Sequence, residues 1–322
     1  MKIYDAYRLA IETGMRHDPR PKEEVDLLLS KAKEEYDALP DGKKEFFDAE
    51  RLWNPFDDCR FCCGEEEARE KDAIRLLWGI DIDVGEVLLA DRLRERGERV
   101  DAIVSHHPTG RSRNMFPKVM WMQTDIYADC GVPINVAEDL MRPRMETVLR
   151  NVMGDNFNRA EEAADLLGFP VFNVHSASDN MVQEYIENRI AEAEPRRLKD
   201  VVDLLMEEPE YRHWARFNDP PRIIRGSPDG RCGGIIAKMT GGTSGPDEMY
   251  AELAKAGVGT IVGMHFPPSA VEECKKCHMN MIVSGHMASD SLGVNLICDV
   301  WEREGVEVAL PKIGRASCRE RV

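Results

Sequence analysis

From Ala73 onward the sequence alternates between short apolar runs and charged segments with helical spacing. The apolar runs at 102–104, 132–136, 169–174 and 258–263 are typical of buried strands. Neighbouring parallel strands need a crossover connection, which is usually a helix. The alternation therefore predicts an α/β protein with largely parallel sheets and helices on their faces. The fold that we expect is two three-layer α/β domains with mostly parallel sheets, plus an N-terminal helical extension.

The same pattern divides the chain into segments. We expect a helical extension at 1–70, an N-terminal α/β domain at 71–180, a helical connector at 181–221 and a C-terminal α/β domain at 222–312. Within this last domain, strands at 222–225 and 233–238 flank Pro228-Asp229-Gly230, which is typical of a hairpin turn. Residues 313–322 resemble the translation of a common sequencing adapter, so we expect them to be an artefact outside the fold.

Three of the predicted strands end in histidine or aspartate. The first ends in Ser105-His106-His107-Pro108, where proline terminates the strand because it fixes φ and donates no ladder hydrogen bond. Adjacent side chains on a regular strand point to opposite faces, so both histidines can reach one site only where the strand ends. The second strand leads to His175 through Asp179, and the third leads to His286 and Asp290, which lie four residues apart on the first turn of a predicted helix.

These strand ends point to a metal site. In open α/β sheets, binding sites lie just past the carboxyl ends of the strands. Imidazole and carboxylate together suit zinc, manganese, iron or cobalt better than magnesium or calcium. The alternative interpretation is a chance group of surface histidines. Any one of the three motifs alone would not distinguish this alternative from a metal site.

Taken in order, the three motifs resemble the Nif-three-like (NGG-interacting factor three-like) family. Its members are also known as dinuclear-metal hexameric proteins or GTP cyclohydrolase type-two homologues. Weaker support comes from Gly79–Asp83, Gly131–Ile134 and Val258–Gly263. The resemblance implies a homohexamer and two divalent transition-metal ions. It implies as metal ligands His106, His107, Asp179, His286 and Asp290, with Asp290 replacing the more usual glutamate.

The residues and the resemblance together predict a dinuclear metal-dependent hydrolase with its metals in the interdomain cleft. The ions would activate a bridging water. We expect Asp179 to be the bridging carboxylate and His175 to transfer protons, which makes these two the candidate catalytic residues. The resemblance implies a small-molecule substrate, in particular a nucleotide such as GTP. The alternative is a non-enzymatic interaction or regulatory protein in which the metals are structural.

Composition excludes some partners. The formal net charge of −16 argues against a nucleic-acid polymer and against an anionic membrane surface. The charged, amphipathic start at 1–8 is unlike a signal peptide, and no apolar run approaches the roughly 20 residues of a membrane span. We therefore expect a cytoplasmic protein.

Four other features have competing interpretations. Cys59, Cys62 and Cys63 could form a zinc site with the pair Cys274 and Cys277, but reduced intracellular cysteines are usually inert and we expect none. The glycine-rich loop 239–245 could cradle a phosphate, but it lacks a lysine and the Walker spacing, so we expect a plain turn.

Two acidic residues, Asp81 and Asp83, lie near a strand end, where either could support a metal ligand; a helix cap with Glu86 suits Asp83 better. His265 is equally consistent with a loop histidine and with a substrate contact.

Overall fold

The computed structural model describes residues 1–309 and contains two β-sheets; the predicted adapter segment lies outside the described residues. The first sheet has five strands, of which four run parallel and β1 is antiparallel to its neighbour. Their order is β1 (Phe61–Cys63), β4 (Val171–Asn173), β3 (Ala102–Ser105), β2 (Arg75–Gly79) and β9 (Glu307–Ala309). The last strand thus lies in the first sheet, although its residues fall within the predicted C-terminal domain at 222–312.

The second sheet has four strands, of which three are parallel and the edge strand β5 is antiparallel. Their order is β5 (Arg222–Arg225), β8 (Asn280–Val283), β7 (Val258–Gly263) and β6 (Gly234–Lys238). The prediction of an α/β fold with mostly parallel strands in two sheets and N-terminal helices is confirmed.

Two local predictions were wrong. β5 and β6 do not form a hairpin, because they lie at opposite edges of their sheet. The turn at Pro228-Asp229-Gly230 instead accepts backbone hydrogen bonds from Leu198 and Lys199. The strand predicted at 132–136 is absent, because Pro133 precedes the first turn of α8 (Ile134–Val152) and the chain turns directly into that helix.

Helices cover both faces of the first sheet, since alternate side chains of its central strands are buried on each side. Leu77 and Ile103 pack with α5 (Val84–Glu95) and α9 (Arg159–Leu166) on one face. On the other face Trp78 packs against Trp301, with ring centroids 4.9 Å apart. This arrangement gives the three layers of an α/β sandwich.

The N-terminal extension packs against the rest of the molecule through α1 (Ile3–Arg16). This helix crosses α10 (Ser176–Ala193) so closely that a Cβ on Gly14 would lie 2.4 Å from the Cα of Ala177. The remainder of the extension forms α2 (Lys22–Ala38), α3 (Asp41–Lys44), the 3-10 helix η1 (Ala49–Leu52), β1 and α4 (Glu65–Glu70).

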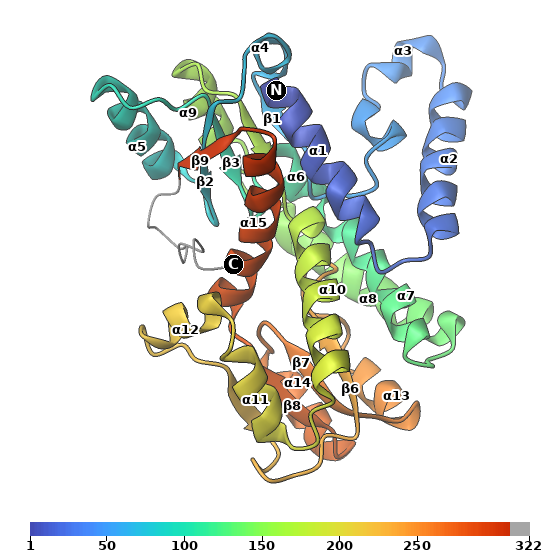
Figure 1. The fold of residues 1–322 in the computed structure, drawn as a ribbon. Helices are drawn as coiled ribbons and strands as arrows, with labels where there is room; N and C mark the ends of the chain where they lie inside the picture. The colour runs from blue at the N-terminus through green and yellow to red at the C-terminus, as the bar shows by residue number, and fades with distance from the viewer. Residues whose placement is uncertain (310–322) are drawn as a thin grey trace.

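Two long helices connect the sheets. Figure 1 shows α10 and α15 (His286–Arg303) beside each other in the middle of the molecule. α10 follows β4 of the first sheet and leads toward the second, whereas α15 follows β8 of the second sheet and leads back to β9 of the first. The close approach of Gly293 to Ser178, where a Cβ would lie 2.8 Å from the carbonyl oxygen, fixes the spacing of the two helices near the first turn of α10. Within residues 1–309, no helix is long and apolar enough to cross a bilayer.

The other helices surround this frame. They are α6 (Gly110–Met115), the 3-10 helix η2 (Phe116–Trp121), α7 (Met122–Asp129), α11 (Leu198–Leu205), α12 (Pro209–Ala215), α13 (Met249–Lys255) and α14 (Pro268–Lys276).

Candidate metal centre

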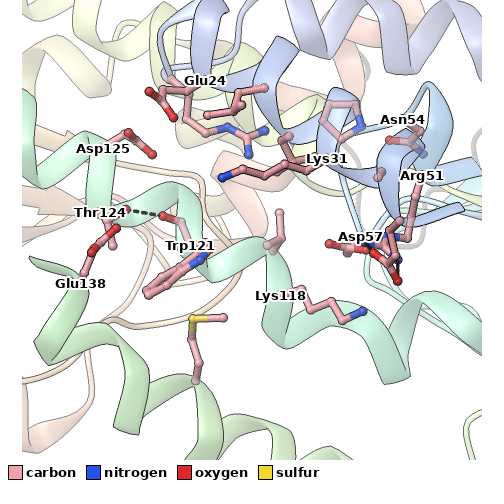
Figure 2. A pocket seen from close by; sticks show the side chains of 18 of the residues that line it. Glu24, Lys31, Arg51, Asn54, Asp57, Lys118, Trp121, Thr124, Asp125 and Glu138 are labelled. Carbon is pink, nitrogen blue, oxygen red and sulfur yellow. Dashed lines mark hydrogen bonds and ion pairs between the residues drawn. The ribbon is translucent and has the colours of Figure 1, made fainter. Parts of the chain in front are cut away.

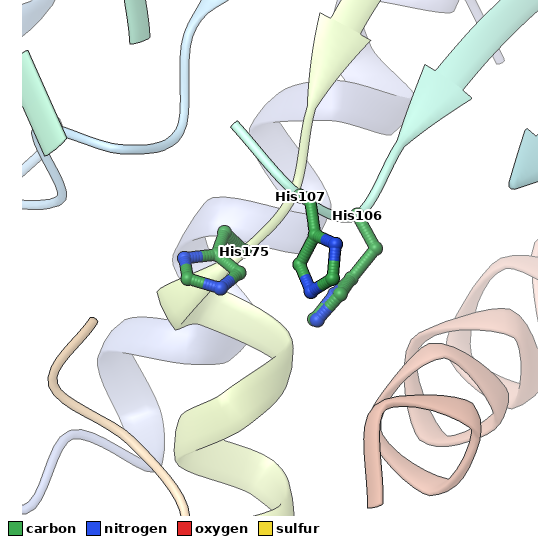
Figure 3. A group of neighbouring side chains, drawn as sticks. All are labelled: His106, His107 and His175. Atoms are coloured by element: carbon green, nitrogen blue, oxygen red, sulfur yellow. The ribbon is translucent and has the colours of Figure 1, made fainter. Parts of the chain in front are cut away.

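The histidines and aspartates predicted from the three strand ends lie together where α10 and α15 begin. His106 and His107 follow β3, His175 immediately precedes α10, and Asp179 lies on the first turn of that helix. His286 and Asp290 lie on the first turn of α15. Figure 3 shows the rings of the first three histidines grouped beside the start of α10. All but His107 and His286 are buried.

Asp290 is at the centre of this group. Its Oδ1 lies 3.5 Å from the Nε2 of His106, and its Oδ2 lies 3.4 Å from the Nε2 atoms of both His107 and His286. Asp179 lies on the same side of Asp290 as His106, with its Oδ1 3.6 Å from the Nε2 of His106. One carboxylate therefore offers an oxygen to each of two sets of potential ligands, which are His106 with Asp179 and His107 with His286.

The buried polar atoms of this group fit a metal ion. Four atoms have no hydrogen-bond partner, namely Nε2 of His106, Oδ1 of Asp179 and both carboxylate oxygens of Asp290. Buried polar groups in native proteins are almost always paired, so four orphans in one place need an explanation. Their separations exceed ordinary hydrogen-bond lengths. Two ligands of one tetrahedral zinc, each about 2.1 Å from the metal, lie about 3.4 Å apart. The buried histidines and aspartates could therefore hold a metal ion.

Hydrogen bonds to the outer nitrogens orient three of the rings. His106 Nδ1 donates to the Val174 carbonyl oxygen (3.2 Å), and His107 Nδ1 donates to Asp81 (2.7 Å). His175 Nδ1 donates to Asp58 (2.7 Å). Such partners fix the tautomer and turn Nε2 inward, as is usual for metal-binding histidines.

The structure also separates the two acids near the end of β2. Asp81 supports His107, whereas Asp83 caps α5 in a capping box with Glu86, as its spacing predicted. The sequence left the role of Asp81 open, because both residues lie at the same strand end.

Without metal, the group shows strongly shifted pKa values. Burial lowers the pKa of His106 to about 4. Burial also opposes charging of His107, but the nearby carboxylates of Asp290 and Asp81 raise its pKa to about 10. Burial raises the pKa of Asp179, whereas the imidazoles around Asp290, His106 foremost, overcome burial and hold its pKa far below the usual range. A metal ion must displace the protons that the raised pKa values leave on His107 and Asp179, because metal-binding nitrogens and carboxylates are deprotonated.

Asp58 is a residue of this centre that the sequence did not reveal. It belongs to the N-terminal extension, is fully buried, and accepts hydrogen bonds through Oδ2 from His175 and from the Ser176 hydroxyl (2.7 Å each). The sequence signal nearest to Asp58 is the cysteine cluster Cys59, Cys62 and Cys63, which does not itself point to a contact with His175. The thiol of Cys59 accepts a hydrogen bond from the backbone of His175, and no cysteine of residues 1–309 joins a group of three potential ligands.

A large cavity lies away from these residues. It measures about 650 Å³ and lies between α2, η2, α7 and α8. Figure 2 shows Trp121 within it, Glu24 and Asp125 on one side, and Arg51 and Asp57 on the other. Because its charged lining has no convergent histidine, its size alone does not make it the metal site.

Comparison with known proteins supports the family resemblance. No family model matches the chain, and no curated protein matches it. Among solved structures, a NIF3 superfamily protein from Sphaerobacter thermophilus is 28% identical, with a TM-score of 0.66 over 76% of this chain and 88% of that one. Reduced HcgD from Methanocaldococcus jannaschii is 10% identical, with a TM-score of 0.50 over 79% of this chain and 88% of that one, a likeness in fold alone. The motifs, the fold and the more similar of these structures agree with the resemblance predicted above: the chain is similar to a NIF3 superfamily protein in its motifs and its fold.

Proposed function

We propose that the protein is a dinuclear metal-dependent hydrolase acting on a small molecule, with a nucleotide as the substrate class that the family resemblance suggests. The observation that carries the proposal is the group of four buried, unpartnered atoms on His106, Asp179 and Asp290. The ligands would be His106, His107, Asp179, His286 and Asp290, holding two divalent ions of zinc, manganese, iron or cobalt.

The division of Asp290 between two sets of ligands supports the count of two ions. Two nearby dications repel strongly, and a shared anion offsets that repulsion in a partly dehydrated site. From the sequence we expected Asp179 to be this bridging carboxylate. The distances favour Asp290, since each of its oxygens faces a different histidine set. Asp179 would then bind on the His106 side alone.

When bound, such a metal pair supplies a water of lowered pKa as the nucleophile. The chain itself supplies a proton carrier. His175 Nε2 lies 3.6 Å from Asp179 Oδ2, and its other nitrogen donates to Asp58. Burial opposes the charged imidazole, but Asp179 and Asp58 together raise the pKa of His175. His175 therefore holds a proton at Nε2 that it can deliver to a leaving group beside the metals.

A substrate screen tests the activity. The protein, loaded in turn with zinc, manganese, iron or cobalt, is assayed against nucleotides and phosphoesters beside Asp179→Asn and His175→Gln. We expect hydrolysis by the wild type and a loss of roughly 10²-fold or more in both variants. The matched control is His213→Ala, because His213 lies in α12 and belongs to none of the potential ligand groups; this variant should retain full activity. Equal activity in wild type and Asp179→Asn would mean a contaminant. No turnover with any metal would favour a non-enzymatic interaction protein instead.

A further inference from the structure

A small pocket lies beside the metal centre, where β6 and β7 end. Its volume is about 40 Å³. His265 connects it to the centre, because its ring lies 4.8 Å from that of His286. We call it the Lys238 pocket; its polar lining consists of Lys238, Thr240, residues 242–245, Tyr250 and His265.

The ammonium group of Lys238 lacks a counter-ion. Its one hydrogen bond is a long one, 3.5 Å to the carbonyl oxygen of Thr240, and no carboxylate within residues 1–309 lies within 4.0 Å of it. Burial lowers its pKa to about 8. Asp179 is the acid that acts on it electrostatically, and the proposed function engages that carboxylate with a metal. A half-buried cation in this situation favours binding an anion.

The other cavity beside the centre is different. It flanks His107 and contains two arginines, but each is already paired. Arg113 contacts Asp155 at 2.9 Å, and Arg159 contacts Asp83 at 3.4 Å. No acidic residue lines the Lys238 pocket. In a chain with a net charge of −16, a cationic pocket without acids next to the metal centre is selective for anions.

The glycine-rich loop adds hydrogen-bond donors. Gln123 donates to the carbonyl oxygens of Gly241 and Thr243, and Arg144 donates to that of Ser244. In a trans peptide the N–H points away from the C=O. The amides that follow these carbonyls, those of Gly242, Ser244 and Gly245, therefore face away from Gln123 and Arg144, and no acceptor within the described chain takes their hydrogen bonds. Free backbone amides that lie close together in a loop bind anions.

The pocket's size limits its occupant. A cavity needs about 10–15 Å³ on this measure to hold one water. A volume of about 40 Å³ therefore admits a phosphate or carboxylate group but not a nucleoside. The rest of a substrate would extend past His265 toward His286 and the metal ligands.

We propose that the Lys238 pocket binds the terminal oxyanion, of phosphate size, of the substrate on which the metal centre acts, with Lys238 and the amides of loop 242–245 as its donors. The inference rests on the proposed function for the reaction but not for the binding itself. The pocket also has the lysine that loop 239–245 itself lacks, since Lys238 precedes the loop at the end of β6.

Calorimetric titration with inorganic phosphate tests the proposal, because it needs no activity. Metal-free and zinc-loaded full-length protein are compared as wild type, Lys238→Gln and Lys238→Arg. The matched control is Lys255→Gln, which changes an exposed lysine of α13. We expect Lys238→Gln to weaken phosphate binding about tenfold or more in the metal-free protein, where phosphate cannot bind a metal. Lys238→Arg and Lys255→Gln should bind within about twofold of wild type, because both keep the pocket's charge. Acetate is titrated in parallel, and tighter binding of acetate would identify the oxyanion as a carboxylate.

Two results would overturn the inference: metal-free wild type that binds neither anion, or Lys238→Gln that binds as tightly as wild type. Zinc content is measured on every sample, so the two proposals can fail separately. Lys238-dependent binding in a protein that takes up no zinc would contradict the proposed function and leave the pocket standing. Normal zinc content in Lys238→Gln together with an unchanged phosphate affinity would contradict the pocket proposal and leave the proposed function standing.

Discussion

The carboxylate of Asp58 and the imidazole of His175 are 117 residues apart in the sequence and meet at 2.7 Å inside the protein. Asp58 comes from the N-terminal extension, whereas His175 immediately precedes the helix that carries Asp179. Metal-site histidines commonly depend on such outer carboxylates for orientation and basicity. The extension therefore contributes directly to the candidate centre, besides packing α1 against α10.

Replacing Asp58 by Asn should weaken this support in a pH-dependent way. Burial opposes ionisation of Asp58, but His175 holds its pKa below the usual value, so its contribution to stability is present above about pH 4 and is lost in acid. The pKa of His175 is raised, so its contribution is complete below about pH 6.5 and is lost as the pH rises through the folded value.

In the metal-free protein, Asp58→Asn should therefore lower the free energy of unfolding most between about pH 4 and pH 6.5, with a cost of about 3 kcal/mol. Urea unfolding at pH 5.5 and pH 9 measures the difference, with Asp41→Asn on exposed α3 as control. A cost that is the same at both pH values would show that charge pairing with His175 is not the cause.

Metal binding should release protons. At neutral pH the metal-free protein holds a proton on His107, whose pKa is raised to about 10 against the opposing effect of burial, and this proton must leave before the nitrogen can bind a metal. Affinity for zinc should therefore rise between pH 6 and pH 9. Calorimetry in buffers with different ionisation enthalpies counts the released protons. Zinc binding with no proton release and no pH dependence would contradict the ligand assignment.

The close crossing of α1 and α10 should tolerate no larger residue. Gly14→Ala would place a methyl group 2.4 Å from Ala177 Cα, and relief of that overlap should cost about 1–3 kcal/mol. Gly85→Ala is the matched control, because it lies in α5 with no atom within 4 Å and should stabilise the helix by about 0.5–1 kcal/mol. Thermal unfolding compares them. Equal melting temperatures for the two variants would show that the extension is not tightly packed.

The family resemblance predicts a closed homohexamer. Light scattering at micromolar concentration should then report six times the chain mass of 36.5 kDa. A monomer at that concentration would contradict the prediction. The result is independent of the metal centre, because each chain supplies the whole proposed set of ligands.

The sequence predicted the centre because its residues follow directly from strand ends. A strand that stops at Pro108 and two helices that begin at His286 and just after His175 leave few positions for these side chains, so local pattern was enough to predict the group. The division of Asp290 between two sets of ligands was not predictable, because it depends on the approach of α15 to β3. Asp58 was missed for the same reason, since no local pattern links it to His175.

The errors in the fold have similar causes. Val132 is buried although it does not lie in a strand. From the sequence alone, a short buried apolar segment of this kind could not be distinguished from a buried strand. The turn at Pro228-Asp229-Gly230 was correct as a turn, but its partners are backbone groups of α11 and not a hairpin ladder. Such pairings are decided by contacts between distant segments, which local propensity does not encode.

The most direct test of the account is the number of metal ions bound by Asp290→Asn, counted by native mass spectrometry after reconstitution with zinc. Wild type should bind two ions per chain. Because one oxygen of Asp290 faces His106 and the other faces His107 and His286, its replacement should impair both positions, whereas His286→Ala should impair one. Circular dichroism confirms that each variant is folded. Two ions retained by folded Asp290→Asn, or no zinc bound by the wild type, would contradict the central claim.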